Sequence, residues 1–349
     1  MRITRRTLFS IAPAAWAAGS EPQNISFPLQ TVEGLITPSD RFFVRDHFAE
    51  PEVSLRDWTL RIEGRVVRPL ELSFADLLEA PTKKAEVVLE CAGNAAGGPA
   101  VGNGVWEGVP LSWLLNQAGV AADAAHVLLE GADSGKLMPS SAGFPYYQVV
   151  PVQKCLSSES LVAFKLNDRY LPRRNGFPAR ALFPGWYGMD SVKWLRRVMV
   201  LGRDQVAAGF AESGMNRLYN RVVENSAGER TATRLTEIQV KSVLAWPPDK
   251  SKLPAGRHQV YGFAWTGAGV VRSVQVSVDG VWAPVVMPRA ARPLSWVRWE
   301  YSWLAAPGEH TLLARATDDA GRTQPLVREA GRRDGYALNF CDPVRCSVR

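Results

Sequence analysis

Apolar and polar residues follow two different patterns along the chain, and the change falls near residue 228. Before it, short apolar runs typical of strands are mixed with short amphipathic segments of helical type. Beyond it the runs have period two and are separated by turns, as in residues 274–278 before Asp279-Gly280, a strong hairpin signal. We therefore predict an α+β fold, with a mixed α/β domain over residues 25–228 and an all-β immunoglobulin-like sandwich over 229–349.

Two short helices of the first domain can be placed by their ends. Ser73 stands before an apolar run with Asp76 three residues later, which is typical of a capping box. The second helix has Ser112 as its candidate N-cap and Gly119 as its stop. Both helices should be short, because turn-forming residues follow closely.

Two strand-like runs lead directly into segments that can carry chemistry. Residues 85–90 are β-prone and run into Cys91, and residues 126–130 run into Gly-Ala-Asp at 131–133. We expect both segments to be loops at strand ends, where binding and catalytic residues are common.

The first residues resemble a targeting signal. Arg2, Arg5 and Arg6 precede a weakly apolar stretch, and Ala-Trp-Ala at 15–17 fits a cleavage site. Paired arginines followed by Thr-Leu-Phe are typical of a twin-arginine signal, which directs export, although an ordinary basic N-terminus is the alternative. We expect residues 1–18 to be removed and the protein to be periplasmic or otherwise exported.

Charge and cysteine content exclude several classes of function. The chain has 41 Lys and Arg against 34 Asp and Glu, a net charge of +7, and three of these charges lie in the predicted signal. The remaining cations are scattered, which argues against nucleic acid as a partner. The four cysteines and four histidines form no CxxC, CxxCH or HExxH motif, so a zinc finger, a c-type haem and a zinc protease are excluded. No run after the signal is long and apolar enough to predict a membrane span.

Cys91 is the first candidate for chemistry. It enters a loop of Gly, Ala and Asn, where backbone amides can approach a ligand and stabilise a thiolate. The alternative is a buried cysteine that acts as a small apolar residue. Cys155, within an apolar segment, is expected to belong to the core.

Cationic residues form two further candidates. Arg180 and Lys193 lie among turn-forming and aromatic residues and could converge on one dianion, unless they are ordinary solvated cations. With strand alternation Phe43, Arg45 and His47 share one face, which places a guanidinium beside an imidazole. A salt bridge between Arg45 and its neighbour Asp46, or a structural histidine, is the alternative.

Taken together, these segments resemble the sulfite oxidase family of molybdopterin enzymes, in its bacterial exported form. The matching motifs are Phe-Phe-Val-Arg-Asp-His at 42–47, Glu-Cys-Ala-Gly-Asn at 90–94, Glu-Gly-Ala-Asp at 130–133, Asn-Gly-Phe-Pro-Ala-Arg at 175–180, Pro-Gly-Trp-Tyr-Gly at 184–188 and Ser-Val-Lys-Trp-Leu at 191–195. The resemblance implies one molybdenum-molybdopterin per chain and no haem. It also implies a homodimer formed through the C-terminal sandwich.

The resemblance also implies roles for individual residues. Cys91 falls on the cysteine whose thiolate ligates molybdenum, Arg45 on the arginine that faces the substrate, and Tyr219 on the active-site tyrosine. These three are the expected catalytic residues. The positions expected to bind the pterin cofactor are Phe43, Val44, Arg45, Asp46, His47, Asp133, Asn175, Arg180, Ser191, Val192 and Lys193, with Asn175 in place of a histidine.

The function implied is transfer of an oxygen atom to sulfite or a related small sulfur oxyanion. With no haem segment, electrons would leave to an external acceptor such as a c-type cytochrome. Ala96 and Asp334 stand where sulfite-oxidising relatives carry arginines, which leaves a reductase of sulfoxides or N-oxides as an alternative. A binding module without metal is a third hypothesis. Cys341 and Cys346 are close enough in sequence to form a disulfide in an oxidising compartment.

Overall fold

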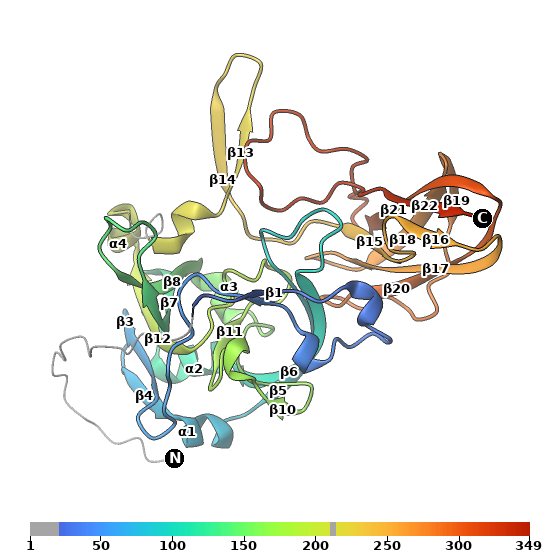
Figure 1. Cartoon of the computed structure of the whole chain (residues 1–349). Helices are drawn as coiled ribbons and strands as arrows, with labels where there is room; N and C mark the ends of the chain where they lie inside the picture. Colours follow the sequence, from blue (N-terminus) through green and yellow to red (C-terminus); the bar gives the residue numbers. More distant parts are fainter. Residues whose placement is uncertain (1–20, 210–213) are drawn as a thin grey trace.

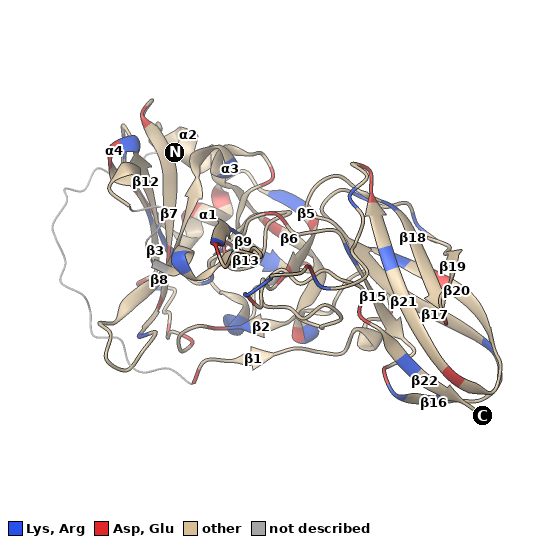
Figure 2. Cartoon of the chain, turned by 90° about the horizontal axis from the view of Figure 1, so that it is seen from above, with Lys and Arg blue, Asp and Glu red and all other residues tan. Residues whose placement is uncertain are grey.

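The computed structural model describes residues 21–209 and 214–349, in two domains that lie side by side (Figure 1). The predicted signal at residues 1–18 lies outside the described residues. Within the described ranges, none of the helices has the length and apolar character needed to cross a bilayer. Lys and Arg are interspersed with Asp and Glu over both domains (Figure 2).

Two five-stranded sheets build the first domain. One sheet has the order β10-β9-β6-β5, with β11 also paired to β9, and the other has the order β4-β3-β12-β7-β8. The strands of the first sheet are β5 (Lys83–Glu90), β6 (Val101–Pro110), β9 (Leu161–Leu166), β10 (Arg169–Tyr170) and β11 (Arg180–Leu182). Those of the second are β3 (Thr59–Gly64), β4 (Leu70–Ser73), β7 (Ala124–Gly135), β8 (Phe144–Pro151) and β12 (Leu195–Gly202). Only β3 and β12 pair in parallel within these two described sheets, so most neighbours are antiparallel.

Short elements connect these sheets. The α-helices are α1 (Phe74–Glu79), α2 (Leu111–Ala118), α3 (Val152–Leu156) and α4 (Arg203–Ala207), and the 3-10 helices are η1 (Leu29–Thr31), η2 (Ser39–Arg41), η3 (Arg173–Asn175) and η5 (Gly214–Leu218). The capping box predicted at Ser73 and Asp76 is present at the start of α1. The N-cap predicted at Ser112 is wrong, because α2 begins at Leu111 directly after Pro110. The Leu111 amide there donates to the Ser160 carbonyl oxygen.

The segment at residues 131–133 also differs from expectation. It is not a loop, because β7 continues through it to Gly135. The pairing of β7 with β8 is irregular between Glu130 and Ser134. Such a bulge redirects side chains at the edge of a site, and here it lies beside Asp133.

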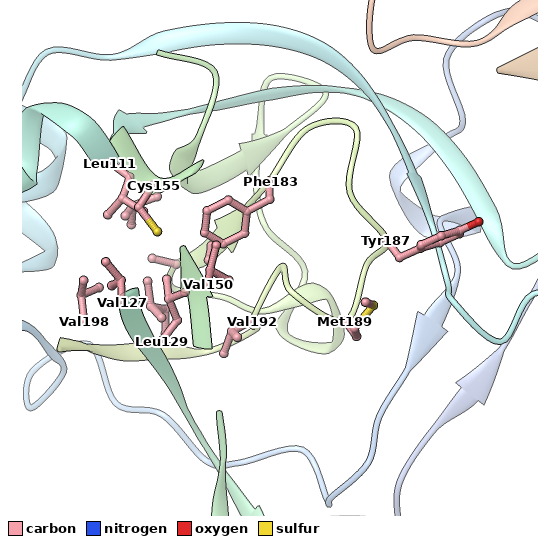
Figure 3. Close-up of a cluster of buried hydrophobic side chains, with 14 of the residues drawn as sticks. Leu111, Val127, Leu129, Val150, Cys155, Phe183, Tyr187, Met189, Val192 and Val198 are labelled. Carbon is pink, nitrogen blue, oxygen red and sulfur yellow. The ribbon is translucent and has the colours of Figure 1, made fainter. Parts of the chain in front are cut away.

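The core of the first domain packs between the sheets and α2 and α3. Leu111, Val127, Leu129, Val150 and Cys155 are fully buried, and Figure 3 shows Cys155 beside Leu111 in this cluster. The expected core position of Cys155 is therefore confirmed. Burial of each such side chain contributes roughly 1.5–3 kcal/mol, which fixes the strands that lead to the site.

The second domain is the predicted sandwich, and the α+β fold class is confirmed. One sheet contains β15 (Lys241–Trp246), β17 (Gly256–Trp265) and β20 (Val297–Ala305). The other contains β16 (Ser251–Leu253), β18 (Val271–Val278), β19 (Val281–Pro284), β21 (Gly308–Asp318) and β22 (Val344–Val348). The predicted hairpin turn joins β18 to β19, with φ of 51° at Asp279 and 89° at Gly280.

Two smaller pairs of strands complete the fold. The hairpin β13 (Asn220–Glu224) and β14 (Arg230–Arg234) projects from the body beside a long C-terminal loop (Figure 1). The domain boundary predicted at residue 228 falls in the turn of this hairpin. Strand β1 (Asn24–Ile25) pairs with β2 (Val44–Arg45), so the start of the described chain is tied to Arg45.

The disulfide that the spacing of Cys341 and Cys346 would allow is not formed in the structure. Both residues are buried free thiols. Cys346 is held on β22, opposite His310 of β21, and belongs to the sandwich core. Cys341 is held separately by a hydrogen bond from its amide to the Pro325 carbonyl oxygen.

Candidate active site

A cavity in the first domain brings together every residue that the sequence predicted for the site. Its lining includes Phe43, Val44, Arg45, Asp46, His47, Cys91, Asp133, Asn175, Arg180, Ser191, Val192, Lys193 and Tyr219. The space between the lining atoms, with its open mouth, measures about 660 Å³. These residues come from segments far apart in the sequence, so the fold itself assembles the cavity.

Cys91 stands where β5 ends, and the loop that follows holds its backbone. The Cys91 amide donates to the Ala100 carbonyl oxygen at 2.9 Å, and the Asn94 amide donates to the Cys91 carbonyl oxygen at 2.9 Å. The thiol is partly exposed to the cavity. Burial raises its pKa, while hydrogen bonds from the Gly93 amide and the Arg45 guanidinium oppose this shift. A cation already directed at the sulfur would stabilise a thiolate.

Arg180 supplies a buried positive charge. It is 5% exposed and donates to the Asn175 carbonyl oxygen at 3.1 Å and the Ser191 carbonyl oxygen at 2.7 Å. Among the described residues, no carboxylate lies within ion-pair distance of it. Burial lowers its pKa to about 10, which leaves the guanidinium charged at neutral pH. A buried cation held only by carbonyl groups is suited to an anionic ligand.

Lys193 forms an ion pair with Asp46 and also donates to the Arg174 carbonyl oxygen at 2.9 Å. The sequence alternative that pairs Arg45 with Asp46 is therefore wrong, since the carboxylate is directed at Lys193. The ammonium also lies 4.0 Å from the ring centroid of Trp194. Burial lowers the pKa of Lys193, and Asp46 opposes that shift.

Two buried oxygen acceptors in this cavity have no hydrogen-bond partner among the residues that the structure describes. They are Oδ1 of Asp133 and Oδ1 of Asn175, which are 4% and 1% exposed. Burial raises the pKa of Asp133 to about 7, although Lys193 stabilises the carboxylate. Buried acceptors without donors are costly, so both atoms fit a ligand that carries N–H groups.

Tyr219 and His47 close the cavity near Cys91. The Tyr219 hydroxyl lies 2.5 Å from Nε2 of His47, and burial raises the pKa of Tyr219 well above its usual range. Burial, Arg45 and Lys193 lower the pKa of His47 to about 4. Both groups are therefore neutral at neutral pH.

Several residues of the site were not predicted from the sequence. Tyr146 lines the cavity from β8, and its buried hydroxyl donates to the Met189 carbonyl oxygen at 2.9 Å. Tyr336 lies with its ring centroid 5.2 Å from that of Tyr219. Tyr146 belongs to a strand with several aromatic residues, which is typical of an ordinary core strand. Tyr336 lies in a loop more than a hundred residues after Tyr219. Neither carries a local sequence signal.

Ala96 and Asp334, where arginines were expected, are not among the residues that line the cavity. Ala96 is buried. Asp334 accepts hydrogen bonds from Arg332 at 2.9 and 2.8 Å, and the pKa of Asp334 falls to about 2 although its partial burial acts in the opposite direction. Arg332 in turn donates to the Tyr336 carbonyl oxygen at 2.6 Å. Asp334 therefore orders the loop that carries Tyr336.

The donor set fits a molybdopterin cofactor. Arg180 offers a cation for a phosphate, and the free oxygens of Asp133 and Asn175 offer acceptors for pterin N–H groups. Cys91 offers one soft sulfur ligand. Within the described ranges, no group of three or more His, Cys, Asp or Glu residues could hold a metal by itself. A metal bound at Cys91 must bring most of its ligands with it, as a molybdenum dithiolene does.

Comparison with known proteins agrees with this donor set. The family described as "Oxidoreductase molybdopterin binding domain" matches residues 47–208. Sulfite oxidase from Gallus gallus is 31% identical over 343 residues, which cover 90% of this chain and 73% of that protein. Nitrate reductase [NADH] from Solanum lycopersicum is 29% identical, over 88% of this chain but only 38% of its own length.

A solved structure has the same overall architecture. The sulfane dehydrogenase SoxCD from Paracoccus pantotrophus superimposes with a TM-score of 0.78 and 28% identity, over 93% of this chain and 87% of that chain. This match extends over both domains and supports an enzyme rather than a binding module. With the sulfite oxidase match, it shows that the chain belongs to the sulfite oxidase family of molybdopterin-dependent oxidoreductases.

Proposed function

We propose that the protein transfers an oxygen atom to sulfite or a related sulfur compound and passes the electrons to an external acceptor, such as a c-type cytochrome. The observation that carries this proposal is that Arg45 and Cys91 line the same cavity, which is suited to molybdopterin, and that burial raises the pKa of the Cys91 thiol while the Arg45 charge opposes this rise. The names of two relatives, a sulfite oxidase and a sulfane dehydrogenase, support a sulfur substrate.

The lining residues suggest separate roles toward the cofactor. Arg180 and Lys193 would hold the cofactor phosphate, while Asp133 and Asn175 would accept hydrogen bonds from the pterin. When bound, the cofactor supplies the two-electron redox chemistry and the oxygen that is transferred. Cys91 would provide the protein's ligand to the metal.

Arg45 and Tyr219 would act on the substrate. The Arg45 guanidinium offers donors to an oxyanion beside Cys91, where positive groups are most effective if water is excluded. Burial keeps the Tyr219 hydroxyl protonated, and in the tautomer of neutral His47 that carries its proton on Nε2 the imidazole donates to Tyr219, which leaves the hydroxyl proton free for a substrate oxygen. Two fixed donors orient the substrate and stabilise charge that develops on it.

A second candidate is reduction of a sulfoxide or N-oxide. The lining near Cys91 includes the uncharged residues Ala92, Gly188 and Met189. With Ala96 and Asp334 outside the lining, Arg45 is the cation whose charge acts on the Cys91 thiol. A single cation suits a neutral polar substrate as well as a monoanion. The few charges near Cys91 therefore favour reduction of a sulfoxide or N-oxide as the second candidate.

Export and assembly are part of the proposal. Residues 1–18 would direct the folded, cofactor-loaded protein to the periplasm through a twin-arginine route. The sandwich domain would form a homodimer, and residues 25–228 would carry the cofactor. Edman sequencing of the exported protein and sedimentation analysis would check the cleavage and the dimer.

Turnover in both redox directions tests the function. Protein with verified molybdenum would be assayed with sulfite, thiosulfate, sulfoxides and N-oxides, using cytochrome c or ferricyanide as acceptor and reduced viologen as donor. We expect oxidation of a sulfur compound that is lost in Arg45→Gln. Turnover of sulfoxides or N-oxides only, with no oxidation of any sulfur compound, would overturn the proposal and establish the second candidate.

A further inference from the structure

A buried ion pair joins the two domains directly behind Cys91. Lys241, the first residue of β15 in the sandwich, places its ammonium 2.9 Å from Oε1 of Glu90, the last residue of β5. Trp265 of β17 donates from Nε1 to Oε2 of the same carboxylate at 2.8 Å. Lys241 and Trp265 are paired residues of neighbouring strands, so the sandwich presents both donors together.

These groups are sealed from solvent. Glu90 is 2% exposed, Lys241 1%, and Trp265 fully buried. Taking a carboxylate and an ammonium out of water is costly, and an apolar pair of similar size often stabilises a fold as well or better. Stability alone therefore gives no reason for this pair. The ion pair differs from an apolar pair because its hydrogen bonds are directional, and each bond fixes the position of a specific atom.

The fixed atoms belong to the loop that carries Cys91. The Lys241 ammonium also donates to the Ala95 carbonyl oxygen at 2.8 Å, and Asn94 donates from Nδ2 to Oε1 of Glu90 at 3.0 Å. Asn94 also accepts the Ala100 amide through Oδ1 at 3.0 Å. The Ala100 carbonyl oxygen in turn accepts a hydrogen bond from the Cys91 amide. Lys241 therefore bonds to Glu90, which precedes Cys91 in the sequence, and to Ala95, which follows it.

We infer that Lys241 and Trp265 of the sandwich are positioning residues for the Cys91 sulfur, acting through Glu90. The sandwich then has a role at the active site in addition to any role in assembly. The inference rests on the proposed role of Cys91 as the metal ligand. Neither residue lines the cavity, so neither touches cofactor or substrate.

Thiol reactivity of the cofactor-free protein gives a readout that is independent of activity. In Lys241→Met, Glu90 loses its cation and the 91–100 loop should open more often. We expect iodoacetamide to alkylate Cys91, identified by peptide mass spectrometry, about fivefold faster than in the wild type, as for local opening. Ser295→Ala is the matched control, because Ser295 bonds to Glu86 on the same strand from the same domain, at 2.6 Å. Its rate should stay within about twofold of the wild type.

A double variant separates positioning from general stability. Glu90→Gln/Lys241→Met removes both charges of this buried pair, so the melting temperature should return toward that of the wild type while the alkylation of Cys91 stays fast. If both the Cys91 alkylation rate and the melting temperature of this double variant return to the wild-type values, the inference is overturned. If Lys241→Met does not fold, Trp265→Phe removes one bond to Glu90 and keeps the ring. An unchanged Cys91 rate in that variant would also overturn it.

The loaded protein separates failure of this inference from failure of the proposed function. The thiolate-to-molybdenum absorption band should shift in Lys241→Met at unchanged molybdenum content and remain in Ser295→Ala. In Cys91→Ser the band should vanish. If the band persists in Cys91→Ser, the proposed role of Cys91 is wrong. If it vanishes there but is unchanged in folded Lys241→Met, only the inference about Lys241 fails.

Discussion

The Tyr219 hydroxyl lies 2.5 Å from Nε2 of His47 and joins the segment before β13 to the segment after β2. The two rings meet edge to face with centroids 5.7 Å apart, and the Tyr336 ring packs against Tyr219 with centroids 5.2 Å apart. Three distant parts of the chain therefore fix one hydroxyl beside the cavity. This arrangement gives the tyrosine a defined direction before any substrate binds.

Removing this hydroxyl should reduce turnover without unfolding the protein. A hydrogen bond to a charged group contributes about 1.5–3 kcal/mol, so Tyr219→Phe should lower kcat/KM by about 10-fold to 150-fold. Tyr301→Phe, on β20 of the sandwich, is the control and should leave it unchanged. Steady-state kinetics on molybdenum-matched samples would check this. Equal kinetics for both variants would remove Tyr219 from the mechanism.

Acid should destabilise the cofactor-free chain through His47. The pKa of His47 falls from 6.5 to about 4 in the fold, so the unfolded chain binds the extra proton first. The stability that neutral His47 provides is complete above pH 6.5 and is lost as the pH falls to about 4, a change of about 3 kcal/mol. His47→Gln should lack this change. The free energy of unfolding would be measured by urea unfolding at several pH values in that range. The same pH dependence of this free energy in both proteins would contradict the assignment.

Asp133→Asn should make the empty protein more stable and the loaded protein harder to form. The pKa of Asp133 is raised to about 7, so its carboxylate is unfavourable above that pH, and the effect disappears as the pH falls. At about pH 8 we expect the substitution to increase the free energy of unfolding by about 1–3 kcal/mol. The same variant should retain less pterin. A gain in both quantities would show that Asp133 does not bind the cofactor.

Arg180 should control cofactor retention. Arg180→Gln removes a buried cation from the site, and we expect cofactor affinity to fall by about 10-fold to 150-fold, as for loss of about 1.5–3 kcal/mol. Arg169→Gln on β10 changes an exposed arginine of the same domain and is the control. Molybdenum and pterin content per chain after gel filtration would measure the effect. Equal content in the two variants would contradict a phosphate site at Arg180.

The cysteines give a simple chemical test of the fold. The structure predicts four free thiols in the described chain, three of them buried. Unfolded, non-reduced protein should therefore take up four alkyl groups. Uptake of only two, with Cys341 and Cys346 unmodified, would show that the tail disulfide forms after all.

Local sequence signals predicted much of the fold because they depend on neighbouring residues. The capping box at Ser73 and the Asp279-Gly280 hairpin are fixed by hydrogen bonds or backbone angles within a few residues. The errors arose where distant contacts decide. Leu111 starts its helix because Ser160 accepts its amide, and β7 continues past Glu130 because β12 pairs with Gly131.

The site shows the same division. Cys91, Arg180 and Lys193 could be proposed from unusual residues in turn-rich segments and from the resemblance to a family. Tyr146 and the Glu90–Lys241 pair could not, since an aromatic residue in a strand or a lysine at its start carries no local signal. The partner of Asp46 was also open, because Arg45 is adjacent in sequence while Lys193 is adjacent in space.

The central claim is that Cys91 ligates molybdenum in the cavity that contains Arg45. X-ray absorption at the molybdenum edge, on loaded wild type and Cys91→Ser with matched pterin content, tests it most directly. The claim predicts one sulfur neighbour fewer around the metal in Cys91→Ser, with Arg45→Gln unchanged from the wild type. The same number of sulfur neighbours in wild type and Cys91→Ser would contradict it.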